Sequence, residues 1–215
     1  MRFGVVESRS VQFDAEMKKL PKEFYLSKNT AKIARELLGK LLVIPSNGQR
    51  VSGMIVEVEA YLGVHDRAAH SFGGRRTNRN EVMYGGGGRV YVFFVYGMYH
   101  QLNFVTGPED HPHAILIRGI EPVEGVEIMR ERRGEMKDTN LTSGPGKLAI
   151  AFDVNRELNG EDLMGDQIWL EEYRKFQKKE IETGKRVGID YAGEDAELPL
   201  RFWVKGNPFV SKTRA

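Results

Sequence analysis

A polar turn between two strand-like segments is the feature that most restricts how this sequence can fold. Residues 40–45 (KLLVIP) and 53–63 (GMIVEVEAYLG) are rich in apolar and β-branched side chains, and Gly48 lies in the polar turn between them. This arrangement predicts a β-hairpin. In the second segment Glu57 and Glu59 alternate with apolar residues, so we expect both carboxylates on one face of the strand.

Other segments predict a mixture of helices and strands. A helix is expected to begin at Ser27 or Asn29 and to end at Gly39. Residues 1–21 show no sustained period and are interpreted as an N-terminal arm, which leaves 22–215 as one domain. The other expected elements are strands at 89–105, interrupted by Gly97, and at 113–120, a helix at 121–134, a short helix within 143–152 and a last strand at 199–206.

Charge is distributed unevenly along the chain although the formal net charge is only +2. Residues 67–89 contain five arginines and the single acid Glu81, in a loop rich in glycine and asparagine. Residues 153–172 instead contain seven acids and the single base Arg156. Net charge alone does not indicate a nucleic-acid partner, but the basic loop could neutralise phosphates locally. We then expect the acidic segment to face away from DNA and DNA binding to depend only moderately on salt concentration.

Composition excludes several kinds of chemistry. The chain has no cysteine, which excludes disulfides, thiolate zinc sites, iron–sulfur clusters and a cysteine nucleophile. Its start is charged and no run of about 18 apolar residues occurs, so we expect a cytoplasmic protein without a membrane span. No metal site is expected, because the histidines lack the spacing of a zinc-protease helix; they are His65, His70, His100, His111 and His113.

Two groups of residues could carry function or could be structural. Glu57 and Glu59 could perform acid–base chemistry in a dry pocket, or they could be two solvated glutamates of a half-buried strand. The aromatic residues within 91–99 could belong to the core, or they could stack on unpaired bases beside the arginines of the preceding loop. These patterns alone favour a nucleic-acid enzyme only slightly over a small-molecule hydrolase.

Seven blocks, in order along the chain, resemble the alkyladenine (3-methyladenine) DNA glycosylase family over about residues 22–212. The blocks are EVEAYLG, DRAAHSFGGRRTNRN, RVYVFFVYGMYHQLN, ILIRGIEPVEG, SGPGKL, and KRVGIDYAGE with PLRFWVKGNPFVS. The resemblance implies a single mixed α+β domain with a curved, mainly antiparallel sheet flanked by helices. It also implies a monofunctional enzyme that flips an alkylated or deaminated purine out of duplex DNA and hydrolyses its N-glycosidic bond. It implies no cofactor, damaged double-stranded DNA as partner, and a monomer without an obligate protein partner.

The resemblance also assigns a catalytic trio. Glu59 matches the general base that holds and deprotonates the attacking water. Arg118 matches an arginine that positions this water, and Val187 matches a residue whose backbone carbonyl does the same. No lysine amine is required, so neither a Schiff base nor strand cleavage is expected.

Four further positions match the pocket for the extruded base. Tyr61 and His70 match residues that stack on the base and hydrogen-bond to it, and Asn103 matches a residue whose side chain clashes with the amino group of guanine. Phe93 stands where the mammalian enzymes have a stacking tyrosine, which keeps the π-face and loses the hydroxyl. A cationic purine between Tyr61 and Phe93 is expected to gain a cation–π contribution of roughly 0.5–2 kcal/mol.

The predicted DNA contacts surround an aromatic wedge. Tyr96 matches the residue that fills the gap left by the flipped nucleotide. The positions expected near the DNA surface or its phosphates are Thr77, Met83, Tyr99, Arg133 and Lys147. The loop at 106–112 and residues 153–182 depart from the family pattern. Two other interpretations remain, a non-catalytic DNA or RNA binder with the same fold and a formyltransferase-like domain. The presence of Glu59 argues against the first, and the aromatic wedge argues against the second.

Overall fold

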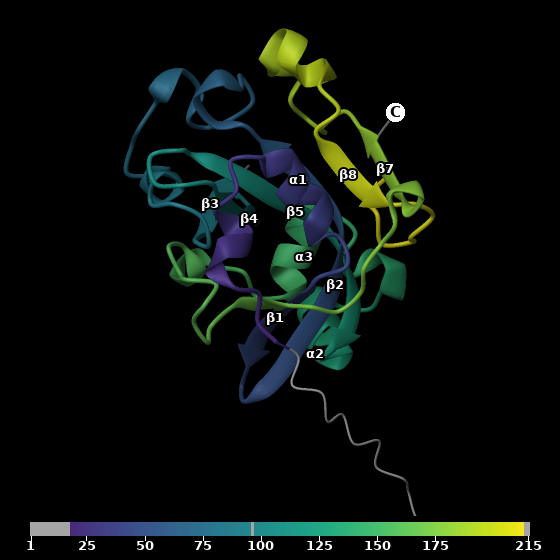
Figure 1. Ribbon diagram of the computed structural model, residues 1–215. Helices are drawn as coiled ribbons and strands as arrows, with labels where there is room; N and C mark the ends of the chain where they lie inside the picture. The colour runs from purple at the N-terminus through teal and green to yellow at the C-terminus, as the bar shows by residue number, and fades with distance from the viewer. Residues whose placement is uncertain (1–17, 96, 213–215) are drawn as a thin grey trace, which may run out of the picture.

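The computed structural model describes residues 18–95 and 97–212, which form one domain around a single large sheet (Figure 1). Within this part of the chain the strands are β1 (Leu41–Ser46), β2 (Gln49–Tyr61), β3 (Val90–Val95), β4 (Tyr99–Thr106), β5 (His113–Glu124), β6 (Trp169–Glu171), β7 (Ile181–Gly184) and β8 (Arg201–Val204). The α-helices are α1 (Thr30–Leu37), α2 (Val126–Arg133) and α3 (Pro145–Ala151). The expected α+β class is confirmed.

Strand β2 is the centre of this sheet. The strands follow the order β3-β4-β5-β2-β1-β6, while β8 pairs with both β2 and β7. All these pairs are antiparallel. On the edge opposite β5, the first half of β2 pairs with β1 and residues 57–59 pair with β8. Register shifts against β5 accompany this change of partner.

Short 3₁₀ helices occupy most of the long connections. They are η1 (Lys22–Tyr25), η2 (Gly63–His65), η3 (Phe72–Gly74), η4 (Glu81–Tyr84), η5 (Asp138–Asn140), η6 (Arg156–Leu158), η7 (Lys178–Glu180) and η8 (Asp190–Glu197). Two of them, η3 and η4, lie in the arginine-rich loop at residues 67–89, and η2 directly precedes it. No helix in the described ranges is long and apolar enough to cross a membrane.

The predicted hairpin is confirmed. Strands β1 and β2 pair from Leu41 with Met54 to Ser46 with Gln49. The turn residues Asn47 and Gly48 both have positive φ angles, of 49° and 75°, as the favoured two-residue hairpin turn requires.

Helix α1 begins at the second of its two expected caps. The side chain of Asn29 accepts a hydrogen bond of 2.9 Å from the backbone N–H of Lys32. Gly39 follows the helix with a φ of +91°, and a Cβ atom there would lie 2.2 Å from the carbonyl oxygen of Arg174. The predicted stop at Gly39 therefore reflects both its left-handed backbone and the close approach of a distant segment.

The helix predicted from residue 121 begins later. Strand β5 continues through Glu124, where it pairs with Ser52 of β2, and α2 starts only at Val126. Gly125, with a φ of +70°, makes the change of direction between them. Backbone pairing with β2 therefore outweighs the helical spacing of residues 121–124.

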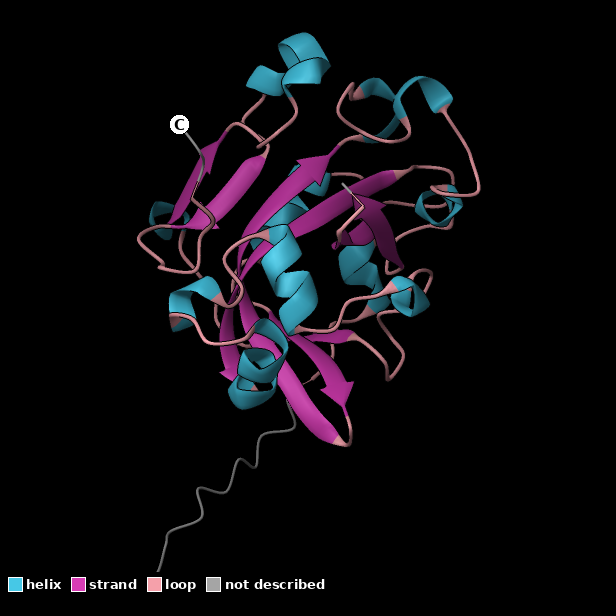
Figure 2. Ribbon diagram, turned by 180° about the vertical axis from the view of Figure 1, so that it is seen from behind, coloured by secondary structure: helices cyan, strands magenta, loops and turns pink. Residues whose placement is uncertain are grey.

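The two sides of the sheet carry different helices. Helix α1 lies in front of the sheet in Figure 1, and α3 lies in front of it in the reverse view of Figure 2. Helix α1 packs mainly on β2, whereas α3 packs on β4 and β5. One continuous core of buried apolar residues joins these layers, including Ile33, Val58 and Leu148.

The expected N-terminal arm lies mainly outside the described residues. Its described end is part of the packed domain, because Leu20 is only 2% exposed and Lys19 forms a bridge with Glu171 at the end of β6. Strand β7 lies in a region where the sequence predicted no element. Its residues pair with β8 from Ile181 with Val204 to Gly184 with Arg201.

We predict that Asn29→Ala lowers the free energy of unfolding by about 1 kcal/mol, because it removes the acceptor that caps α1. Ser27→Ala is the control, since among the described residues the Ser27 hydroxyl bonds only the backbone N–H of Asn29, which lies outside the helix. Urea unfolding of both variants measures the difference. Equal losses would show that Asn29 is not the effective cap.

Candidate active site

A pocket of about 170 Å³ lies between the arginine-rich loop, strands β3 to β5 and the segment that follows β7. It is lined by Tyr61, Ala68, Ala69, His70, Met83, Tyr91, Phe93, Val95, Gln101, Asn103, Ala114, Leu116, Arg118, Val187, Gly188, Ile189 and Tyr191. The structure thus brings together Tyr61, His70, Phe93, Asn103, Arg118 and Val187 from six separate parts of the sequence. All of them were candidate site residues.

Glu59 lies directly behind the wall of this pocket. Its side chain is completely buried, and its Oε2 accepts a hydrogen bond of 2.9 Å from the hydroxyl of Tyr61. Its Oε1 accepts one of 2.7 Å from the backbone N–H of Val187 and lies 3.3 Å from Nη1 of Arg118. All three partners line the pocket, so a water that binds Glu59 from the pocket must displace or share one of these contacts.

The environment of Glu59 differs in two respects from the expectations. Glu57 and Glu59 are both fully buried, so the interpretation as two solvated glutamates is wrong. The backbone N–H of Val187 donates to the carboxylate, a contact that the sequence did not predict, while the role expected for its carbonyl toward the water stays a prediction. Burial, with the Glu59 charge as the next cause, holds the pKa of Tyr61 well above its ordinary value, so its hydroxyl keeps the proton that it donates.

The neutral imidazole of His70 forms a second polar group of the pocket. Its Nδ1 lies 2.8 Å from the hydroxyl of Tyr91, and its ring packs edge-on against Phe93 with the centroids 4.5 Å apart. Burial, followed by the charges of Arg79 and Arg75, lowers the pKa of His70 to about 4. Burial also raises the pKa of Tyr91 to about 12, so this hydrogen bond joins two neutral groups near neutral pH.

The side-chain amide of Asn103 is held by two backbone carbonyl groups. Its Nδ2 donates to the carbonyl oxygens of Tyr91 and Gln101 at 3.1 and 3.3 Å, and the residue is only 3% exposed. Strand pairing sets Asn103 on β4 opposite Tyr91 on β3. Two backbone acceptors therefore restrict rotation of the amide within the pocket wall.

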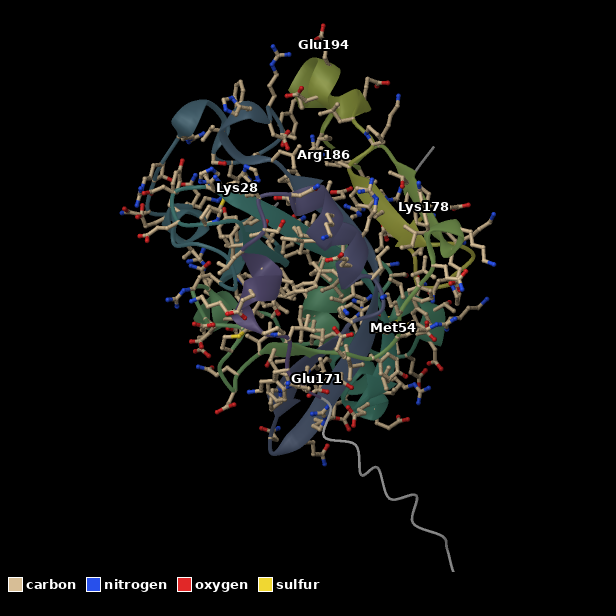
Figure 3. The ribbon with its side chains drawn as sticks, in the orientation of Figure 1. Lys28, Met54, Glu171, Lys178, Arg186 and Glu194 are labelled. Carbon is tan, nitrogen blue, oxygen red and sulfur yellow. The ribbon has the colours of Figure 1, made fainter. Side chains whose placement is uncertain are left out.

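Each aromatic wall has a guanidinium group beside it. Arg186 lies 4.8 Å from the centroid of Tyr61 and forms a fully buried ion pair with Asp66, and Arg79 lies 5.3 Å from the centroid of Phe93. Figure 3 shows Arg186 below the turn that carries Glu194. Because each aromatic ring already interacts with a guanidinium group, the cation–π contribution expected for a cationic purine between them is smaller.

Arg186 and Asp66 were not among the predicted site residues. They are separated by 120 positions in the sequence, and both oxygens of Asp66 accept from Arg186. The sequence signals were that Asp66 begins the block DRAAHSFGGRRTNRN and that Arg186 precedes Val187 in KRVGIDYAGE. A charge in a short polar segment does not by itself predict complete burial.

The predicted DNA contacts fall into separate groups. Tyr99 is 37% exposed and packs on Gly146 of α3, where a Cβ atom would lie 3.0 Å from the tyrosine ring. Lys147 follows on the same helix and donates to the side chain of Asn140, near half-buried Arg133, whose Nε donates to the carbonyl of Leu141. Thr77 is exposed in the arginine-rich loop and bonds Asn80. The wedge candidate Tyr96 lies outside the described residues.

Met83 occupies a different position from the one expected. It is only 2% exposed and packs with Tyr84, Tyr91 and Ala114 instead of lying on an open surface. Met83 also lines the pocket. The η4 turn buries it against β3 and β5.

The arginine-rich loop presents fewer unpaired cations than its composition implies. Arg76 forms ion pairs with Glu81 and Asp110 and stacks on Tyr84. Arg89 donates to the carbonyl oxygen of Gly160. Some of the positive charge predicted to face phosphates is thus neutralised or held within the protein.

Known proteins resemble this chain over most of its length. The family model of Methylpurine-DNA glycosylase (MPG) matches residues 23–208. A protein of Clostridium acetobutylicum is 50% identical over 201 residues, covering 90% of this chain and 97% of its own length. A protein of Desulfitobacterium hafniense is 48% identical over 203 residues, covering 91% of this chain and 99% of its own length. Both carry the name "Putative 3-methyladenine DNA glycosylase".

The matched range extends from η1 to the segment after β8 and includes every residue that surrounds the pocket. The relatives in turn are matched over nearly their whole length. The chain belongs to the methylpurine-DNA glycosylase family and is a hydrolase that acts on N-glycosyl bonds.

Proposed function

We propose that this protein flips an alkylated or deaminated purine out of duplex DNA into the described pocket and hydrolyses its N-glycosidic bond, leaving an abasic site. The observation that carries this proposal is the position of Glu59. A fully buried carboxylate lies behind a pocket lined by several aromatic side chains, Tyr61 and Phe93 among them, and three pocket residues hold it in place. A non-catalytic DNA binder has no need of a desolvated carboxylate there.

In the proposed reaction Glu59 accepts a proton from a water molecule. The water oxygen forms a bond to C1′ of the deoxyribose, and the bond from C1′ to the purine nitrogen breaks with its electron pair passing to the purine. Arg118, 3.3 Å from Glu59, and Val187 fix the carboxylate from two other directions. The negative carboxylate also stabilises the positive charge that develops on the sugar.

Recognition of the base is proposed to combine stacking and exclusion. Tyr61 and Phe93 offer aromatic faces, and neutral His70 offers a ring nitrogen for a hydrogen bond. Asn103, whose amide is anchored to the backbone, excludes the exocyclic amino group of guanine. The partner is damaged double-stranded DNA, bound by a monomer in the cytoplasm or at the nucleoid.

We predict that Glu59→Gln binds damaged duplex normally and lowers its single-turnover excision rate by about 10²–10⁴, the contribution of a general base. The measurement is release of hypoxanthine or 3-methyladenine from a labelled duplex, with excess enzyme and a metal chelator. Glu182→Gln is the matched control, because this half-buried glutamate bonds Trp203 away from the pocket. Undiminished excision by Glu59→Gln would remove Glu59 from the base role.

We predict that Asn103→Ala releases guanine from undamaged duplex at a measurable rate, because the amide that excludes the guanine amino group is gone. Excision of hypoxanthine, which lacks that amino group, should change much less. Both rates are measured on otherwise identical duplexes. If guanine remains as resistant as with the unchanged protein, another residue excludes it.

We predict that His70 makes the protein less stable as the pH falls from about 6.5 to about 4. Its folded pKa, lowered by burial to about 4, lies below the ordinary value of 6.5, so the unfolded chain binds more protons in this window. His70→Gln should flatten this part of the stability curve in urea unfolding. His65→Gln, which changes an exposed imidazole, is the control. Parallel curves for the unchanged protein and His70→Gln would contradict the lowered pKa.

A further inference from the structure

A segment that follows β8 is folded directly onto the buried carboxylate of Glu57. Oε2 of Glu57 accepts a hydrogen bond of 2.6 Å from the backbone N–H of Ser211, and Oε1 accepts one of 2.8 Å from its hydroxyl. A Cβ atom on Gly119 would lie 2.7 Å from the carbonyl oxygen of Phe209 and 3.2 Å from Cβ of Glu57. Glycine at position 119 therefore leaves the room that this segment occupies.

Arg118 connects this buried cluster with the pocket. Its Nε donates to Oε1 of Glu57 at 2.9 Å, and its Nη2 donates to the hydroxyl of Ser211 at 3.2 Å. Only Nη1 remains for Glu59, at 3.3 Å. Each nitrogen of the guanidinium group thus faces a different residue.

Arg201 completes the cluster from β8. Its Nε donates to Oε1 of Glu57 at 2.7 Å, and its Nη2 donates to the carbonyl oxygen of Ser211 at 3.1 Å. Two arginines therefore balance two buried carboxylates, Glu57 and Glu59. The backbone N–H of Ser211 donates to Glu57, and its backbone carbonyl oxygen accepts from Arg201. These bonds satisfy polar atoms that the ion pairs alone do not, as buried ion pairs require.

An arginine beside a carboxylate tends to form two parallel hydrogen bonds to it. If Arg118 were free to turn, it would present two nitrogens to Glu59 and stabilise its charged form more strongly. We propose that Glu57 and Ser211 are positioning residues that hold Arg118 so that only its Nη1 faces Glu59. This inference rests on the proposed role of Glu59 as the general base.

The arrangement limits the contact between Arg118 and the Glu59 carboxylate to one guanidinium nitrogen. The titratable and charged groups around it are Tyr61 and Glu57 on β2, Arg118 on β5, Arg201 on β8 and Arg186 after β7. Among these groups Arg118 is the cation nearest to the carboxylate, and Ser211 and Glu57 determine its orientation. Loss of the Ser211 hydroxyl frees Nη2 to turn toward Glu59.

The test compares Ser211→Ala with Ser211→Thr and Ser52→Ala. Ser211→Thr keeps the hydroxyl, and Ser52→Ala removes another buried serine hydroxyl that bonds a glutamate on the same sheet, Glu124. Ser211→Ala is used in place of Glu57→Gln, which leaves an uncompensated buried charge and risks misfolding. The measurements are single-turnover excision against pH, affinity for damaged duplex and thermal unfolding of the full chain.

We expect Ser211→Ala to lower the plateau rate by about tenfold and to move the acid limb of the profile by about half a pH unit to lower pH. Affinity for damaged duplex should not change, and Ser211→Thr should restore both properties. An unchanged rate and acid limb, or an equal loss in Ser52→Ala, would overturn the positioning role. Full excision by Glu59→Gln would instead defeat the proposed function, so the two failures are distinguishable.

Discussion

The ion pairs that Arg118 makes with two buried carboxylates connect the fold of this protein to its chemistry. Glu57 and Glu59 are both fully buried on β2, and each carboxylate would cost several kcal/mol to bury without a partner. The compensating arginines come from β5 and β8, the two strands that pair with β2 at this point. The site can therefore form only when three strands from distant parts of the chain have assembled.

Elements determined by neighbouring residues were predictable from the sequence. The turn at Gly48 and the cap at Asn29 each depend on contacts within a few positions. Residues 121–124 form a strand because they pair with β2, and β7 forms because it pairs with β8. The spacing of apolar residues within a segment does not predict such pairing. The register shifts of β2 likewise arise from its change of partner, a property of the whole sheet.

In the candidate site the sequence likewise identified residues but not the contacts between their atoms. Resemblance to a family identified Glu59, Tyr61 and Asn103, which the structure brings together around one pocket or directly behind its wall. It did not reveal which atoms would meet, such as the backbone N–H of Val187 at the Glu59 carboxylate. Counting arginines also overstated the free charge of the loop at 67–89, because Arg76 is paired with acids.

Tyr61 joins the two tasks that the proposed reaction requires. Its ring lines the pocket, its hydroxyl donates to Glu59, and its position is fixed by the buried guanidinium of Arg186 beside the ring. A base that stacks on Tyr61 thus rests on the same rigid side chain that orients the carboxylate. Because the Arg186–Asp66 ion pair is fully buried, movement of the ring would have to disturb the segment after β7, which also supplies the N–H of Val187. In the proposed reaction, base binding and water activation therefore depend on one connected set of buried contacts and not on two independent sites.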